Sequence, residues 1–533
     1  MVWADDEPTC TTLAAWTESA PPLPSPPENE LSNPIALWTI CDNSHLFKIV
    51  TPIDVDRLEL LLSSHPNRPL VISICRGFHV GFWPWAMTEG IERPLTVDNS
   101  FRPLSDETHV SFVREQHDTE MALERFSPAF GPDLLPGMTS IPMGVVPKPH
   151  SVKLRLVVDQ SSGDFSPNSL IPREHVAVLL DSLHHLDLSL INARSVHGDT
   201  PLVVFKSDVS QAYWWIPLHF LWQLFQIITI DTMRHVDRNN NFGNRGAGRL
   251  WGAFMGLVLW IAIFIKGIED LFTYVDDSFS WEFADNMLWY EPYQKLLPAK
   301  QTQLLLLWDE LHIPHEESKQ VFGSPLMIIG FDVDPNNMTI TMPAQSWSDL
   351  LTALREFTHP GQRCPLREFQ RLAGWLNWAL NAYPLLQPGM LSLYHKMSGK
   401  VHAPQLIWVS VSLCRELTWF AGRMEQSDGI HIMSSREWGK SDADFSFFCD
   451  ACPIGMGFRL PTRNIGFQHA LDPNIPSLGI FFCEAWTVLS ALHWAVHHLP
   501  LHPRACVLCC TPTTLTPLTC STLCVHNLSI THW

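Results

Sequence analysis

Phe272-Thr273-Tyr274-Val275-Asp276-Asp277-Ser278-Phe279-Ser280 places two adjacent carboxylates between two short runs of β-forming residues. This pattern predicts a β-hairpin whose turn carries the acids. Neighbouring side chains of a strand point to opposite faces, so both carboxylates reach one site only if the chain turns there. An Asp-Asp pair at a hairpin tip is also what an ordinary polar turn contains, so the pair needs a partner.

The partner is the segment Lys206-Ser207-Asp208, which follows the hydrophobic run Val203–Phe205 and precedes Tyr213. Nucleotidyl transfer with two metal ions needs carboxylates from separate strands, so that two Mg²⁺ ions roughly 4 Å apart stabilise the attacking and leaving oxygens together. Asp208, Asp276 and Asp277 meet that requirement and are the predicted metal ligands, for Mg²⁺ or alternatively Mn²⁺. Tyr213 would lie under the incoming sugar and exclude a 2′-hydroxyl; a tyrosine buried in the core is the alternative.

Together, these two segments resemble the first and third palm motifs of reverse transcriptases. The resemblance implies an α+β fold of the right-hand polymerase type, with fingers, palm and thumb. It also implies RNA-directed DNA synthesis on an RNA or DNA template-primer from deoxynucleoside triphosphates. Three short sequences are most similar to those of DIRS-like elements, the tyrosine-recombinase retrotransposons of fungal genomes: Leu221–Gln223, Val236–Phe242 and Leu372–Trp378. This likeness runs from about residue 60 to 504 and makes other retroelement proteins candidate partners.

The resemblance assigns further residues by position. The cations that would meet the triphosphate of the incoming nucleotide are Lys148, Lys153 and Arg155. Gly243 falls in the motif under the template and nucleotide, where glycines permit close backbone approach; a plain Gly-rich turn is the alternative.

Two later segments complete the polymerase assignment. Lys319 matches a lysine proposed to protonate departing pyrophosphate, and a surface lysine is the alternative. Gly330 and Phe331 resemble the primer grip, which places the primer terminus near the metals.

A last domain resembles RNase H, with Asp450 on its first strand and Glu484 on a helix as metal ligands. RNase H chemistry needs several acids around two metals, but residues 505–533 contain no Asp or Glu. We therefore expect an aberrant tail there and hypothesise a frameshift near Arg504, so RNase H activity is doubtful. A rival interpretation of the pairs Cys449/Cys452 and Cys506/Cys509 is a zinc site.

The bulk properties are those of a folded protein, with 46% hydrophobic and 17% charged residues among 533. The net charge of -19 is unusual for a protein that binds a polyanion. Thirteen scattered cysteines and no secretory signal suggest a reducing compartment, either cytoplasmic or nuclear. The apolar run Leu250–Ile265 is short for a membrane span and is predicted to be a buried helix, so no membrane partner is expected.

The expected domains follow the composition along the chain. They are a disordered Pro-rich tail (1–45), an N-terminal helical or fingers extension (46–135), fingers and palm (136–345), thumb or connection helices (346–435), a partial RNase H-like α/β domain (436–504) and the tail (505–533).

The thumb should contain one amphipathic helix, with apolar residues on one face and arginines on another. The apolar residues are Leu366, Phe369, Leu372, Ala373, Leu376 and Leu380, and the arginines are Arg363, Arg367 and Arg371.

Two functions stay open: an active polymerase, or a non-catalytic remnant that only binds nucleic acid or has a structural role.

Overall fold

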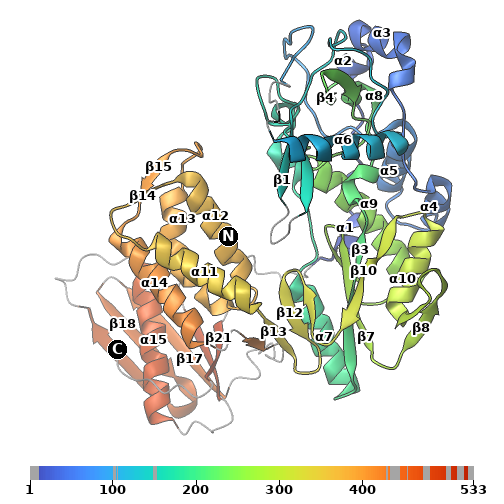
Figure 1. Cartoon of the computed structure of the whole chain (residues 1–533). Helices are drawn as coiled ribbons and strands as arrows, with labels where there is room; N and C mark the ends of the chain where they lie inside the picture. Colours follow the sequence, from blue (N-terminus) through green and yellow to red (C-terminus); the bar gives the residue numbers. More distant parts are fainter. Residues whose placement is uncertain are drawn as a thin grey trace. The chain divides into compact units, whose positions relative to one another are not determined.

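The computed structural model describes residues 11–99, 104, 106–147, 153–427, 430–432, 444–452, 454–471, 480–499, 506–512 and 521–525. The chain divides into a large unit, Thr11–Met433, and a small unit that begins at Ser434. Figure 1 labels the helices and strands of both. Helices and strands both contribute to the structure, which confirms the predicted α+β class.

A four-stranded antiparallel sheet, in the order β10-β3-β7-β6, organises the large unit. Its strands are β3 (Leu202–Val209), β6 (Phe272–Tyr274), β7 (Asp277–Phe283) and β10 (His315–Gly323). Alternate residues of β3 enter two different hydrophobic cores: Phe205 and Val209 belong to one, Leu202 and Val204 to the other. Because both faces of the strand are buried, its sequence is hydrophobic almost throughout.

Three long helices pack around this sheet: α7 (Leu183–His197), α9 (Ala247–Trp260) and α10 (Ala299–Glu310). Helix α9 continues into a π-helical turn, Ile261–Ile265. Within the described residues this is the one helix long and apolar enough to cross a membrane, but 72% of it is buried. It contacts α1, α5 and β6, which fits the predicted buried core helix.

The N-terminal segment is ordered from residue 11 onward, where the sequence analysis expected a disordered tail up to residue 45. Its helices are α1 (Leu13–Thr17), α2 (Glu28–Leu31) and α3 (Pro34–Asp42), with a 3-10 turn at Ser44–Leu46. Leu13 and Leu23 are buried in the main core, and the Asn67 amide donates to the Thr17 and Ala20 carbonyls. Tertiary partners therefore order a composition that would be solvated alone.

Three further helices follow, each beginning at a polar N-cap that accepts a backbone N–H, Asp54, Asn67 or Asp106. They are α4 (Val55–Leu61), α5 (Arg68–Val80) and α6 (Glu107–Ala122).

Two hairpins and α6, which contacts a strand of each, form a smaller core around Phe126, Leu156 and Ile228. The hairpins are β1 (Met143–Pro147) with β2 (Leu154–Val158), and β4 (Ile227–Ile230) with β5 (Met233–Val236). A short helix, α8 (Phe220–Gln223), precedes β4, and a third hairpin, β8 (Met287–Tyr290) with β9 (Lys295–Pro298), follows β7.

The second half of the large unit combines a sheet with a helical bundle. The sheet contains β11 (Leu326–Ile328), β12 (Phe331–Asp334), β13 (Thr339–Thr341) and β16 (Ile430–Ile432). The bundle contains α11 (Ala344–Phe357), α12 (Leu366–Ala379), α13 (Leu391–Met397) and α14 (Val411–Gln426), with the strand pair β14 (Arg363–Pro365) and β15 (Leu406–Trp408).

Helix α12 is the predicted amphipathic thumb helix. Its apolar residues from Leu366 to Leu376 are buried, whereas Leu380 is half-buried at the C-cap. Arg367 and Arg371 are exposed on α12 as expected, whereas Arg363 is exposed but belongs to β14, before the helix begins.

The small unit has a five-stranded sheet in the order β19-β18-β17-β20-β21, in which β17 and β20 are parallel. Its elements are β17 (Phe445–Cys452), β18 (Gly455–Leu460), β19 (Ile465–Ala470), α15 (Ile480–His498), β20 (Cys506–Pro512) and β21 (Ser521–Val525). The expectation of an aberrant tail without elements after residue 504 was wrong, because the apolar run 506–512 pairs with β17 as an inner strand. Arg504 lies outside the described residues, and the frameshift stays a prediction about the coding DNA.

Gly256 of α9 tests how the N-terminal segment is held. A Cβ atom there would lie 2.7 Å from Thr17 Cγ2 and 3.3 Å from the Leu13 carbonyl oxygen. We expect Gly256→Ala to lower the free energy of unfolding by about 1–3 kcal/mol, because α1 must move. The matched control is Gly422→Ala in α14, where a Cβ meets nothing within 4 Å and should stabilise by about 0.5–1 kcal/mol. Urea unfolding of both variants would show this, and equal shifts would contradict the packing of α1 on α9.

Candidate active site

The predicted hairpin exists, and its turn has two residues. Tyr274 pairs with Asp277, which leaves Val275 and Asp276 as the loop. Val275 has a φ of +60°, a conformation that β-branched residues rarely adopt and that costs about 1–3 kcal/mol. The Trp251 indole N–H of α9 donates to the Val275 carbonyl at 2.7 Å. A buried tryptophan therefore holds the turn in its strained form.

The sheet brings all three predicted acids to one place. Asp208 and Asp277 are direct partners across β3 and β7, so their side chains leave the sheet on the same face. The Val209 amide donates to the Asp276 carbonyl at 3.1 Å, which ties the turn to the end of β3. The three side chains are half-buried.

Burial and mutual repulsion govern the protonation of these acids. Burial raises the pKa of Asp276, and the neighbouring Asp208 raises it further. The pKa of Asp277 is raised to about 6, mainly by burial; the Lys206 charge opposes the rise, and Asp276 and Asp208 add to it. Such shifts are typical of clustered carboxylates that await a cation.

Two lysines contact the acids. Lys319 Nζ lies 2.7 Å from Asp208 Oδ1, and Lys206 Nζ lies 3.4 Å from Asp277 Oδ2. Although burial lowers the pKa of Lys319, its hydrogen bond with Asp208 and the charge of that carboxylate raise it overall. The predicted general acid is therefore protonated and close to one of the predicted metal ligands.

The donor set fits a hard divalent cation. All three side chains offer carboxylate oxygens, which Mg²⁺ and Mn²⁺ prefer. Asp277 Oδ1 is buried and has no hydrogen-bond partner, so this oxygen is available as a ligand. In the described part of the chain no three Asp, Glu, His or Cys side chains converge closely enough to hold a metal as they stand. Two of these carboxylates instead contact lysines.

Next to the acids is an aromatic platform. The ring centroids of Tyr213 and Phe242 are 4.9 Å apart, and the Arg155 guanidinium lies 5.7 Å from the Phe242 ring. Burial and the charge of Asp276 raise the pKa of Tyr213 to about 12. The structure thus places Tyr213 and Arg155 on one platform beside the carboxylates; Lys153 is exposed and Lys148 lies outside the described residues.

Gly243 permits a close approach, but to protein rather than to open space. A Cβ there would lie 1.9 Å from the Val158 carbonyl oxygen of β2. The Asn168 amide donates to the Gly243 carbonyl at 2.8 Å. This glycine therefore fixes the β1–β2 hairpin against the loop that carries Phe242.

Gly330 lies in the turn between β11 and β12, Phe331 begins β12, and helix α12 packs against both. Ile329 and Gly330 have φ values of +49° and +82° between β11 and β12. The Trp378 indole of α12 donates to the Ile329 carbonyl at 3.2 Å, and its ring lies 4.5 Å from that of Phe331. The role of this turn in holding a primer stays a prediction.

In the small unit, Asp450 and Glu484 lie in different surroundings, and their role as metal ligands stays a prediction. Strand β17 buries Phe447, Cys449 and Ala451, whereas Asp450 points to the exposed side. Glu484 is buried on α15. The same alternation places Cys449 and Cys452 on opposite faces, which argues against the zinc interpretation.

Three residues that position the site were missed by sequence reasoning. The buried Asp181 accepts the Leu13 and Thr273 amides at 2.8 Å each and so ties the N-terminal segment to β6. Trp251 holds the turn, and the Gln320 amide donates to the Asp208 carbonyl at 3.2 Å. Their partners are remote in sequence, so no local pattern marks them.

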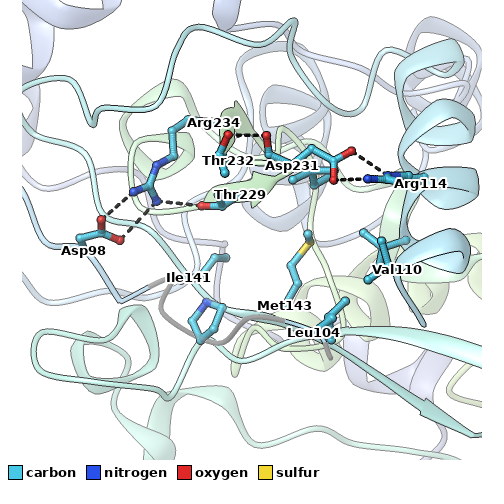
Figure 2. Close-up of a pocket in the computed structure, with 13 residues that line it drawn as sticks. Asp98, Leu104, Val110, Arg114, Ile141, Met143, Thr229, Asp231, Thr232 and Arg234 are labelled. Atoms are coloured by element: carbon cyan, nitrogen blue, oxygen red, sulfur yellow. Dashed lines mark hydrogen bonds and ion pairs between the residues drawn. The ribbon is translucent and has the colours of Figure 1, made fainter. Parts of the chain in front are cut away.

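A cavity of about 600 Å³ lies elsewhere in the large unit, between α6, β1 and β4. Figure 2 shows its apolar floor and two flanking ion pairs, Arg114–Asp231 at 2.8 Å and Arg234–Asp98 at 2.6 Å. None of the predicted site residues lines it.

Comparisons with known proteins give structural likeness only. No protein-family model matches the chain, and no curated protein matches it. One similar solved structure is a foamy viral protease-reverse transcriptase in complex with an RNA/DNA hybrid, at 14% identity and a TM-score of 0.44. The match covers 87% of this chain and 58% of that chain, so the chain spans little more than half of that protein.

Two further structures of the foamy viral protease-reverse transcriptase are similar at 15% identity. The one titled dRH, in complex with double-stranded DNA, has a TM-score of 0.46 and covers 88% of this chain and 76% of that chain. The other, with double-stranded DNA, has a TM-score of 0.45 and covers 86% and 89%.

Asp277 offers a test of the electrostatics. A carboxyl whose pKa is raised by folding contributes stability below its unfolded pKa and loses it as the pH rises through about 6. Without metal, Asp277→Asn should therefore raise the free energy of unfolding by about 1–2 kcal/mol at about pH 7.5 and have little effect near pH 4. Urea unfolding in a chelator would measure this. A variant less stable than wild type at the higher pH would contradict the account.

Proposed function

We propose that this chain is an RNA-directed DNA polymerase, a reverse transcriptase of a retroelement, which extends a primer 3′ end by two-metal nucleotidyl transfer. The observation that carries the proposal is the meeting of Asp208, from the end of β3, with Asp276 and Asp277 at the β6–β7 turn. Acids from separate strands on one face are what two-metal chemistry requires.

Each side chain then has a role. Asp208, Asp276 and Asp277 would hold two Mg²⁺ ions, with Mn²⁺ as a substitute. When bound, these ions stabilise charge on the attacking and leaving oxygens. The buried Asp277 Oδ1, which no hydrogen bond satisfies, is the oxygen best prepared for a cation.

The residues around the acids would bind and orient the nucleotide. Arg155 carries a planar fork suited to phosphate oxygens, and exposed Lys153 with Lys148 would add positive charge. Tyr213, packed on Phe242, would exclude a ribose 2′-hydroxyl and favour deoxynucleotides. Lys319, protonated beside Asp208, would donate its proton to the departing pyrophosphate.

The finer assignment is a DIRS-like retrotransposon whose RNase H-like unit does not cleave RNA. Support for the second part is the outward direction of Asp450 and the burial of Glu484. A second candidate function is a catalytically inactive remnant that only binds nucleic acid, favoured by the lysines that engage two of the three acids.

Primer extension separates the two functions. With poly(rA)·oligo(dT), dTTP and Mg²⁺, the wild-type chain should incorporate dTMP, and Asp276→Asn should lower the rate at least about a hundredfold, since losing a metal ligand costs several kcal/mol of transition-state stabilisation. Chelation of the metal should abolish incorporation.

The matched control is Asp285→Asn, an exposed acid beyond the far end of β7, which should retain full activity. Binding of a fluorescent RNA/DNA hybrid, measured on the same proteins, shows whether a protein that incorporates no nucleotide still binds nucleic acid. Binding without incorporation in any of the proteins would establish the remnant and reject the polymerase.

A further inference from the structure

Lys319 is placed against Asp208 by an irregularity in β10. His315 pairs with Val209 and Gln320 with Ser207, so five steps along β10 match two along β3. Bulges of this kind bend a strand and re-aim side chains, and they are common beside active sites. The result is that Lys319 points at the end of β3.

The bulge is fixed at both ends. The Gln320 amide donates to the carbonyls of Asp208 and Glu316 at 3.2 and 3.0 Å. The Ser210 hydroxyl donates to the Glu316 carboxylate. Lys319 is therefore held by a built framework, and its ammonium is only partly exposed, with 37% of the side chain accessible.

The charges around this ammonium do not balance. Asp208, Asp276, Asp277 and Glu316 are four acids, and Glu316 and Asp276 both act on Lys319 electrostatically. Lys206 and Lys319 are the two cations that contact them. With every group charged, the four acids exceed the two lysines by two negative charges.

Lys319 and a metal ion would compete for the same atom. An ammonium 2.7 Å from Asp208 Oδ1 would lie close to a cation bound to that oxygen at about 2.1 Å. Two positive charges at such a separation repel strongly in a partly buried site. This repulsion makes the lysine and the metal compete for Asp208.

We propose that Lys319 is the built-in counter-ion of the metal-free site: it neutralises Asp208 until a divalent cation displaces it, and the displaced ammonium then faces the substrate phosphates. This inference rests on the proposed function, because the cation is the polymerase metal. Binding of the metal would then release the Lys319 ammonium to act as the proton donor. Lys319 is therefore a positioning residue in the metal-free site and a catalytic residue only after the metal has bound.

Metal binding by the full chain tests the proposal. Isothermal titration with Mn²⁺ alone should give a dissociation constant roughly tenfold lower for Lys319→Gln than for wild type, because the competing charge-assisted hydrogen bond is gone. Lys319→Arg, which keeps the charge, should bind Mn²⁺ nearly as wild type does. Circular dichroism would verify that both variants are folded.

A matched control separates competition from net charge. Lys295→Gln also removes one positive charge near β10, since Lys295 pairs with Glu317, but it leaves Asp208 untouched. This variant should bind Mn²⁺ as wild type does. If Lys295→Gln lowered the dissociation constant for Mn²⁺ as much as Lys319→Gln does, the change in overall charge would explain both results. The proposal that Lys319 is a counter-ion would then be rejected.

The remaining outcomes distinguish this inference from the proposed function. Unchanged or weaker Mn²⁺ binding by Lys319→Gln, with binding still lost in Asp276→Asn, overturns the counter-ion and leaves the polymerase proposal standing. No Mn²⁺ binding by wild type, or binding that Asp276→Asn does not alter, overturns both.

Discussion

Repulsion among Asp208, Asp276 and Asp277 is the constraint on which the rest of the large unit depends. Three carboxylates in one half-buried place oppose folding, since like charges in a partly desolvated site repel strongly. Burial raises the pKa of Asp276 and Asp277, and the neighbouring carboxylates raise both further. The fold tolerates this repulsion through two lysines, which contact Asp208 and Asp277, and through a rigid surrounding framework.

Helix α9 is the main element of that framework. Its Trp251 fixes the strained Val275 carbonyl, and its Gly248 lies against Val178 and the Tyr213 hydroxyl. Its Gly256 accepts the N-terminal helix α1. One buried helix therefore connects the acidic turn, the aromatic platform and the N-terminal segment. Asp181 adds a second connection by accepting the Leu13 and Thr273 amides. The strained backbone of Val275 persists because several contacts of the surrounding structure hold it in place.

Sequence reasoning recovers what local pattern and chemistry determine. The acidic hairpin, the strand that carries Asp208 and the apolar face of α12 follow from alternation and helical periodicity. Sequence reasoning fails where contacts with residues distant in the sequence determine the local structure. The Pro-rich segment from Thr11 to Leu46 is ordered by contacts with α9 and Asn67, and strand β20 is defined by pairing with β17.

The direction of a side chain is harder still to predict than the element that carries it. Asp450 lies on the expected strand but faces away from the packed side, which no one-dimensional motif could indicate. Lys319 reaches Asp208 only through a bulge in β10.

The most direct measurement of the central claim is cleavage of the full chain by bound Fe²⁺ with ascorbate, mapped by mass spectrometry. The account predicts paired cuts around residue 208 and around residues 276–277, suppressed together by excess Mg²⁺. Cuts at one of these segments alone, or at neither, would contradict it.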